Sequence, residues 1–186
     1  MSKARWLMLP ALLATSVASA APVTAQEIRD LLPLTGFERM GNDAATSMLA
    51  SVALFQQFPA AQRECMATPI GEVLNEALVD RLVTKLGNDG QQHLKRWQAF
   101  YSSQGGKRMV ASQRQMMYGT ALPAEFEGEP SELERKQVGE FMASGSYEAL
   151  GAVLAELGDM PDGLPLRMSE RIQSQCGVTI DPEEFS

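Results

Sequence analysis

Apolar residues recur at spacings of three and four along most of this chain, which is the period of an amphipathic α-helix. One such stripe predicts a long helix over residues 37–58 that ends at Pro59, and it consists of Met40, Ala44, Met48, Val52 and Phe55. Leu, Met, Ala and Glu are abundant while Val, Ile, Thr and Tyr are sparse, and this bias favours helices over strands. The pattern therefore predicts an all-α fold, a bundle of about six to eight helices arranged as helical hairpins.

Capping residues predict where several helices begin and end. Thr68 followed by Pro69 indicates a helix start, and Gly87 indicates the end of that helix. Ser103 is a further N-cap candidate. Two capping boxes are predicted, Asp89 with Gln92 and Ser131 with Glu134. The tail after Cys176 is expected to fray.

The first 25 residues are typical of a cleaved secretory signal peptide. Lys3 and Arg5 precede an apolar run that is too short for a stable membrane span, and small residues follow it. Two cleavage sites fit the small-x-small rule, after Ala20 and after Ala25, and the second is slightly favoured. No cysteine lies near either site, which excludes lipid attachment there. The predicted location is the periplasm, with no transmembrane segment in the mature chain.

The domain plan follows from these features. Residues 26–122 form the main helical region, the proline- and glycine-rich residues 123–131 form a linker loop, and residues 132–186 form a C-terminal helical hairpin packed on the same domain. A weak internal repeat aligns residues 97–103 with 138–144. Each copy ends a helix and leads through a serine into another, which indicates two hairpins of similar design.

The charge of the mature chain excludes some partners. Removal of residues 1–25, which hold two of the 16 basic and none of the 23 acidic residues, leaves a net charge of −9. Nucleic acids and anionic membranes require positive surface, so general binding to either is not expected. Residues 81–114 are a basic exception in which only Asp89 is acidic. The acidic segment from Glu125 onward either neutralises them, the preferred interpretation, or leaves a surface for an anionic partner.

Two cysteines, Cys65 and Cys176, remain after the signal peptide is removed. An even number of cysteines in an oxidising compartment favours a disulfide over two buried thiols. Such a bond would close a loop of about 110 residues and contribute about 4 kcal/mol to stability.

The segment Phe100-Tyr101-Ser102-Ser103-Gln104-Gly105-Gly106-Lys107 resembles the signature of a bacterial family of exported helical proteins, the domain of unknown function 2059 family. The family signature is Phe-Tyr followed by x-Ser-x-x-Gly, and Phe100, Tyr101, Ser103 and Gly106 occupy those positions. Residues 29–36 are similar to the opening helix of the family, and the resemblance extends over residues 27–120. It implies an all-helical bundle in the periplasm, and it implies no activity or catalytic residue.

This motif has two interpretations. In the first and preferred one, it is a structural elbow where two aromatic side chains are buried, Ser103 caps the second helix, and Gly105 or Gly106 lets the backbones approach. In the second, it is a recognition notch in which the Tyr101 hydroxyl and the first amides of the new helix bind an anion. The candidate binding residues are Tyr101, Ser103, Lys107 and Arg108.

Catalytic and metal sites are not apparent in the sequence. The single histidine, His93, lies beside Lys95 and Arg96 without an evident nucleophile, and no Gly-x-Ser-x-Gly elbow exists. One histidine and two distant cysteines do not form a zinc site. The methionines, among them Met40, Met48, Met109 and Met116, recur at helical spacing and are interpreted as core rather than as copper ligands. No cofactor is expected.

These observations lead to one preferred functional hypothesis and two alternatives. The preferred hypothesis is a non-catalytic periplasmic binding module that interacts with an envelope protein or with an anionic envelope component. The first alternative is an enzyme with an unfamiliar site near His93 and Tyr101. The second is a structural or stress-related envelope protein without a specific ligand.

Overall fold

The computed structural model describes residues 21–155 and 162–185, and these residues form helices and no strand. The predicted all-α class is confirmed. The charged and apolar parts of the predicted signal peptide lie outside the described residues. No described helix is both long enough and apolar enough to cross a bilayer. The helices are α1 (Ala25–Thr35), α2 (Met40–Ser51), α3 (Ala53–Gln56), α4 (Ala60–Leu86), α5 (Gly90–Ser102), α6 (Gln104–Tyr118), α7 (Glu132–Met142), α8 (Gly145–Ala155) and α9 (Leu164–Cys176).

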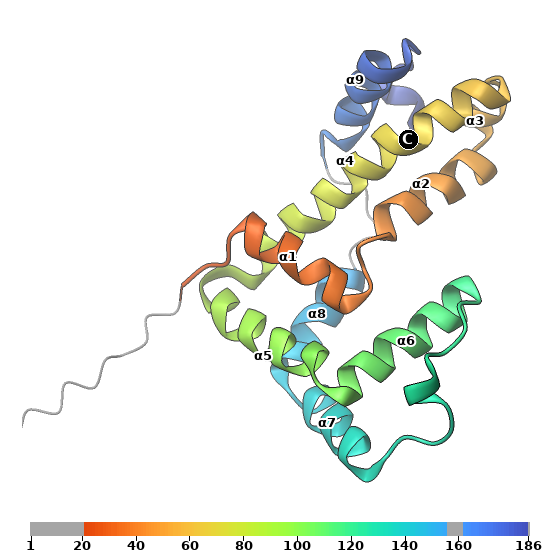
Figure 1. The fold of residues 1–186 in the computed structure, drawn as a ribbon. Helices are drawn as coiled ribbons and strands as arrows, with labels where there is room; N and C mark the ends of the chain where they lie inside the picture. Colours follow the sequence, from red (N-terminus) through yellow and green to blue (C-terminus); the bar gives the residue numbers. More distant parts are fainter. Residues whose placement is uncertain (1–20, 156–161, 186) are drawn as a thin grey trace, which may run out of the picture.

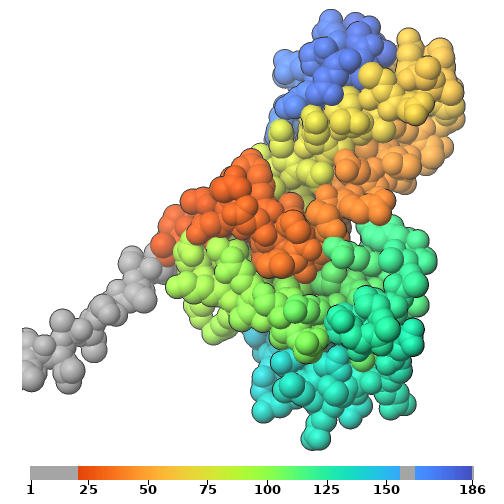
Figure 2. All heavy atoms as spheres, in the orientation of Figure 1, coloured from red at the N-terminus to blue at the C-terminus, as the bar shows by residue number. Residues whose placement is uncertain are grey.

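The long helix α4 runs through both hydrophobic clusters of the protein (Figure 1). Its first half packs with α2, α3 and α9 around Ile70, and we call this the Ile70 cluster. Its second half packs with α1, α5, α6, α7 and α8 around Trp97, and we call this the Trp97 cluster. Figure 2 shows the two parts meeting at a waist occupied by α1 and the start of α2. Residues 132–186 are divided between the clusters rather than forming one hairpin, since α7 and α8 join the second while α9 joins the first.

The helix predicted over residues 37–58 is broken at Val52. This residue has an extended backbone, with φ −83° and ψ 125°, between α2 and α3. The break directs Leu54 and Phe55 into the Ile70 cluster. The buried face of α2 is Gly41, Ala45 and Leu49 rather than the predicted stripe. The prediction was one position out of phase because the alanines and methionines of α2 do not distinguish its faces.

The predicted helix start at Thr68-Pro69 is also wrong, because α4 begins at Ala60 and passes through both residues. A proline inside a helix removes one backbone hydrogen bond and usually kinks or ends the helix. Here Pro69 is buried, and α4 buries Met66 and Ile70 on either side of it. Packing of this face therefore offsets the local cost of the proline. Gly87 does end the helix, as predicted.

Close contact between α2 and α4 depends on two glycines. A Cβ atom on Gly41 would lie 2.5 Å from the carbonyl oxygen of Gly71, and one on Gly71 would lie 2.2 Å from Oδ1 of Asn42. The amide of Gly41 donates to Oδ1 of Asn75 at 3.0 Å, so the polar groups at this crossing are paired across the helices.

We expect Gly41→Ala to lower the free energy of unfolding by about 1–3 kcal/mol, because the added methyl group meets backbone and forces the helices apart. Gly139→Ala is the matched control, since Gly139 lies inside α7 with no atom within 4 Å of its added Cβ. It should stabilise by about 0.4–1 kcal/mol through the lower entropy of the unfolded chain. Urea unfolding followed by circular dichroism measures both changes. Equal effects of the two substitutions would show that the crossing is not tightly packed.

Helix α9 lies along α4 and is fixed to it by a disulfide and by ion pairs. Cys65 and Cys176 are bonded, as predicted, with Cα atoms 5.9 Å apart. Arg167 pairs with Glu76 at 2.8 Å and with Asp80 at 3.6 Å, and Arg171 pairs with Glu72 at 3.1 Å. An acidic row on α4 therefore faces a basic pair on α9, and these ion pairs favour one register of the two helices.

Residues 177–185 pack against the rest of the protein, contrary to the expectation that the tail after Cys176 frays. Val178 and Ile180 are buried in the Ile70 cluster, and the Ser169 hydroxyl donates to the carbonyl of Ile180 at 2.5 Å. The two apolar side chains hold the tail against α9, and they are the sequence signal that the prediction overlooked.

The predicted capping box of Asp89 with Gln92 does not form. Asp89 belongs to a short 3-10 turn, Gly87–Asp89, and its side chain makes no capping hydrogen bond at the start of α5. The amide of Gln91 donates instead to the carbonyl of Ala21 at 3.1 Å. A distant backbone carbonyl has therefore replaced the local side-chain cap, which sequence spacing cannot reveal.

Candidate functional site

The residues of the predicted motif lie at the turn between α5 and α6, which we call the elbow (residues 100–108). Ser103 separates the two helices in an extended conformation. Its hydroxyl accepts from the amide of Gly106 at 3.2 Å and donates to the carbonyl of Phe100 at 2.6 Å. One side chain thus caps the beginning of α6 and the end of α5 together, which confirms the predicted N-cap.

The two glycines of the elbow allow close contact of backbones. A Cβ atom on Gly106 would lie 2.1 Å from the carbonyl oxygen of Phe100, and one on Gly105 would lie 2.9 Å from the carbonyl oxygen of Glu134. Gly106 therefore permits the sharp turn itself, while Gly105 permits the approach of α7. Both positions support the elbow interpretation of the motif.

The aromatic pair of the elbow is buried against α7. Phe100 and Tyr101 are each 6% exposed, and the Phe100 ring stacks on Phe141 with centroids 3.9 Å apart and planes 3° from parallel. Tyr101 meets both phenylalanine rings edge to face. Burial, with a smaller effect of Tyr147, raises the pKa of Tyr101 to about 12. Its hydroxyl is therefore protonated and neutral at physiological pH and can donate a hydrogen bond.

The internal repeat has matching structures in its two copies. Ser144 repeats the role of Ser103 at the end of α7, because its hydroxyl donates to the carbonyl of Phe141 at 2.6 Å. The stacked rings of Phe100 and Phe141 occupy equivalent positions in the repeat. The two hairpins, α5 with α6 and α7 with α8, are therefore joined through the same residue of each copy.

The structure does not bring the four candidate binding residues into one site. Ser103 lines a depression of about 550 Å³ between α5 and α7, whereas Arg108 lines a groove of about 400 Å³ between α6 and α7. Tyr101 and Lys107 share a third depression of about 450 Å³, which we call the α1–α6 depression. It is lined by Pro33, Leu34, Tyr101, Ser102, Lys107, Val110, Ala111, Arg114, Pro123, Glu125 and Phe126.

Three amides in the first turn of α6 already have partners within the protein. The amide of Gly105 donates to Oε1 of Gln137 at 2.8 Å, and that of Gly106 donates to Ser103. The amide of Lys107 donates to the carbonyl of Ser103 at 2.9 Å. An anion at the start of α6 would have to displace these bonds, so the geometry disfavours the recognition notch.

Arg108 is used inside the protein rather than for a ligand. Its Nε lies 2.8 Å from Oε1 of Glu134, and only 14% and 10% of these side chains are exposed. Its remaining donors bind the carbonyls of Phe126 at 2.8 Å and Gly128 at 3.0 Å. Arg108 therefore fixes the linker loop, where Phe126 is buried, to α6 and α7.

The Arg108–Glu134 pair should make stability depend on acid pH. Hydrogen bonds from the Arg108 side chain, then from Ser131, lower the pKa of Glu134 from 4.5 to about 2. The unfolded chain binds this proton more readily, so the stabilisation is complete above pH 4.5 and is lost as the pH falls toward 2. We expect Glu134→Gln to melt at a lower temperature near neutral pH and to lose less stability on acidification than the wild type.

Thermal melting between about pH 7 and about pH 2 checks this expectation. Some acid dependence should remain in the variant, because hydrogen bonds from Gln91 and Thr24 also lower the pKa of Glu27. Wild-type and Glu134→Gln curves that run parallel over the whole range would contradict the assignment.

The basic segment, residues 81–114, is only partly neutralised by the acidic segment that follows it. Arg108 pairs with Glu134, as that interpretation expects, but Arg114 pairs with Glu38 at 2.5 Å. No ion pair between described residues includes Lys95, Arg96 or Lys107, and all three are exposed. Lys107 lies in the α1–α6 depression and Arg96 lines the depression between α5 and α7, each beside apolar side chains.

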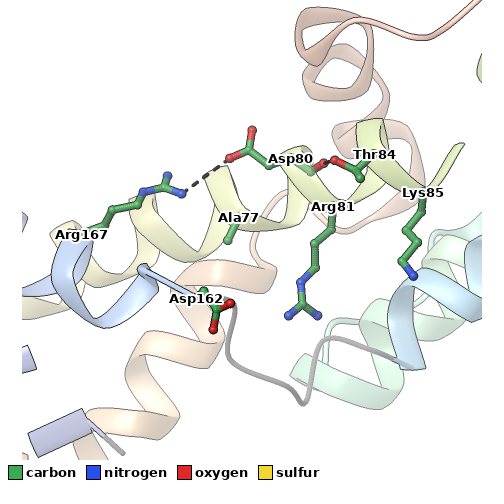
Figure 3. Close-up of a pocket in the computed structure, with 7 residues that line it drawn as sticks. All are labelled: Ala77, Asp80, Arg81, Thr84, Lys85, Asp162 and Arg167. Carbon is green, nitrogen blue, oxygen red and sulfur yellow. Dashed lines mark hydrogen bonds and ion pairs between the residues drawn. The ribbon is translucent and has the colours of Figure 1, made fainter. Parts of the chain in front are cut away.

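Two further basic residues, Arg81 and Lys85, line a depression of about 370 Å³ between α4 and the start of α9 (Figure 3). Arg167 lines it too and is held by Asp80, and Asp162 contributes a second carboxylate. Ala77 is the one apolar side chain in its lining, and Arg81 and Lys85 both interact with other groups of the protein. This depression is therefore weaker than the α1–α6 depression as a ligand site.

His93 has a partner that the sequence did not reveal. Its Nδ1 lies 3.0 Å from the hydroxyl oxygen of Ser146, and the indole nitrogen of Trp97 donates to the carbonyl of the same serine at 2.8 Å. Ser146 is completely buried, so a substrate cannot reach its hydroxyl. The arrangement joins α5 to α8 and does not form an accessible nucleophile and base.

Within the described ranges, no group of three or more His, Cys, Asp or Glu side chains could hold a metal ion. Comparison with known proteins gave no relative: no family model, no curated protein and no solved structure matches the chain.

Proposed function

We propose that the chain is an exported periplasmic protein that binds an anionic, partly apolar component of the cell envelope and does not catalyse a reaction. The α1–α6 depression is its proposed ligand site. The domain of unknown function 2059 resemblance carried by the elbow is part of this proposal. The Cys65–Cys176 disulfide supports the export part, because such bonds persist mainly in oxidising compartments.

The observation that carries the binding proposal is the combination of groups in the α1–α6 depression. Leu34, Val110 and Phe126 supply apolar surface, and 41% of Leu34 is exposed. Lys107 supplies a positive charge that forms no ion pair among the described residues, although the carboxylate of Glu125 lines the same depression. A cavity of about 450 Å³ is within the range of small-ligand sites. An apolar group that carries a carboxylate or phosphate fits this combination.

Two probes of equal length test the proposed ligand chemistry in isothermal titration calorimetry, octanoate and uncharged octanol. We expect saturable binding of octanoate and weaker binding of octanol. Lys107→Glu replaces an attraction with a repulsion of similar size and should weaken octanoate binding by about tenfold, since each exposed charge interaction contributes about 0.2–1 kcal/mol. Octanol binding should not change.

Lys136→Glu is the matched control, because Lys136 is 68% exposed on α7 and does not line the depression. Arg108 is avoided as a test position because its reversal would break the pair with Glu134. Octyl phosphate in the same assay distinguishes a phosphate from a carboxylate ligand. Equal loss of octanoate affinity in Lys107→Glu and Lys136→Glu, or no saturable binding of either anion, would refute the proposed site.

A further inference from the structure

The residues just before α1 are built into the Trp97 cluster. Val23 is 3% exposed and packs with Ile28, Leu31 and Leu86 in that cluster. Its contact with α5 is close, because a Cβ atom on Gly90 would lie 3.0 Å from Cγ1 of Val23. Removal of Val23 would leave a gap between α1 and the start of α5.

The backbone of this segment also supplies a hydrogen-bond acceptor to the first turn of α5. The carbonyl of Ala21 accepts from the amide of Gln91 at 3.1 Å, where the Asp89 side chain makes no cap. The first amides of a helix lack partners within the helix, so this bond supplies one of them. Figure 1 shows the segment before α1 passing the α4–α5 turn.

Thr24 caps α1, and Glu27 links α1 to α5. The Thr24 hydroxyl accepts from the amide of Glu27 at 3.2 Å, and the Thr24 amide donates to Oε2 of Glu27 at 2.8 Å. The side-chain amide of Gln91 donates to both carboxylate oxygens of Glu27 at 2.9 Å. Thr24, Glu27 and Gln91 therefore form one network across the two helix starts.

From these contacts we infer that the mature protein begins at Ala21, released by hydrolysis of the peptide bond between Ala20 and Ala21. Water adds across this bond, which leaves a carboxylate on Ala20 and a free amine on Ala21. Cleavage after Ala25, the site slightly favoured by sequence, would remove Val23, the Thr24 cap and the Ala21 carbonyl together. This inference rests on the proposed export of the chain.

The backbone conformations of Ala21 and Ala25 agree with the choice. Ala25 is already the first residue of α1 and is partly buried against the Trp97 cluster, whereas Ala21 lies before the helix. Recognition of a peptide by strand addition requires extended backbone, which a helix does not offer. Once α1 has formed, the chain around Ala25 can no longer bind to a protease in an extended conformation.

The first test is the N-terminus of the protein recovered from the periplasm of a bacterium that expresses the full chain. Mass spectrometry of the N-terminal peptide should find Ala21 as the first residue. A chain that begins at Gln26 would overturn the inference while the proposed export stood. A chain that retains Met1 in the cytoplasm would overturn both.

A second test does not depend on export. Chains produced directly with their first residue at Ala21 or at Gln26 are compared by thermal melting, and the longer chain should melt at the higher temperature. In the longer chain, Val23→Ser should reproduce the loss, whereas Pro22→Ala, at an exposed position, should not. Equal melting temperatures of the two chains would overturn the inference.

Discussion

Reduction of the Cys65–Cys176 disulfide is expected to lower the free energy of unfolding by about 4 kcal/mol. The bond joins residues 111 positions apart in the sequence, so in the unfolded state it closes most of the chain into one loop. Loss of this constraint increases the entropy of the unfolded chain far more than that of the folded chain. Native stability is commonly about 5–15 kcal/mol, so the change should be a large fraction of the total.

Urea unfolding with and without dithiothreitol measures this effect. The double variant Cys65→Ala with Cys176→Ala should resemble the reduced wild type and should not respond to the reductant. The ion pairs of Arg167 and Arg171 should keep α9 in place in the folded state of both. A reduced protein with an unchanged unfolding midpoint would show that the bond does not constrain the unfolded chain.

Trp97→Ala should cost about 3–5 kcal/mol, the usual range for truncation of a large buried aromatic side chain. Trp97 is completely buried and lies among helices α1, α4, α5 and α8. Its indole nitrogen also donates to the carbonyl of Ser146, which joins α5 to the beginning of α8. The substitution therefore creates a cavity and removes a buried hydrogen bond at one point.

Circular dichroism in urea measures this loss, because the variant lacks the tryptophan that fluorescence would report. Trp97→Phe should lose less than Trp97→Ala, since the ring keeps most of its apolar contacts. Met116→Ala is the surface control and should change stability by less than about 0.5 kcal/mol. Met116 is 86% exposed, so its interpretation as core was wrong, whereas Met40, Met48 and Met109 do pack against the two clusters. Similar losses in Trp97→Ala and Met116→Ala would contradict the described core.

Features that depend on residues close in sequence were predictable. The Ser103 cap and the capping box of Ser131 with Glu134 are present, because each joins groups three residues apart. The aromatic elbow followed from residue type. The disulfide joins residues far apart in the sequence, but it was predictable from the compartment and the cysteine count. In each case the sequence itself supplies the interacting groups.

Other features that depend on distant partners were not predictable. Helix α4 passes through Pro69 without ending because residues on both sides of the proline are buried. The start of α5 has no Asp89 cap, and the carbonyl of Ala21 accepts a hydrogen bond there instead. His93 meets Ser146 across 53 positions in the sequence. Nothing near these residues in the chain signals the contact.

The composition of the candidate site was also not predictable from the sequence. Lys107 and Arg108 are neighbours in sequence and were assigned to one surface. Successive helix residues are about 100° apart around the axis, so the two side chains leave α6 in different directions. Arg108 therefore meets Glu134 on α7, while Lys107 reaches the depression beside α1.

Helix α4 couples the unfolding of the two clusters. Its residues Ile70 and Leu82 belong to different clusters yet lie on one continuous rod, so neither cluster can melt without exposing part of the other. An interaction that stabilises one cluster therefore raises the free energy of unfolding of the whole molecule. A ligand bound beside α1 would slow the opening of the distant region around the disulfide, and the protein would report occupancy as a rise in its single global melting temperature.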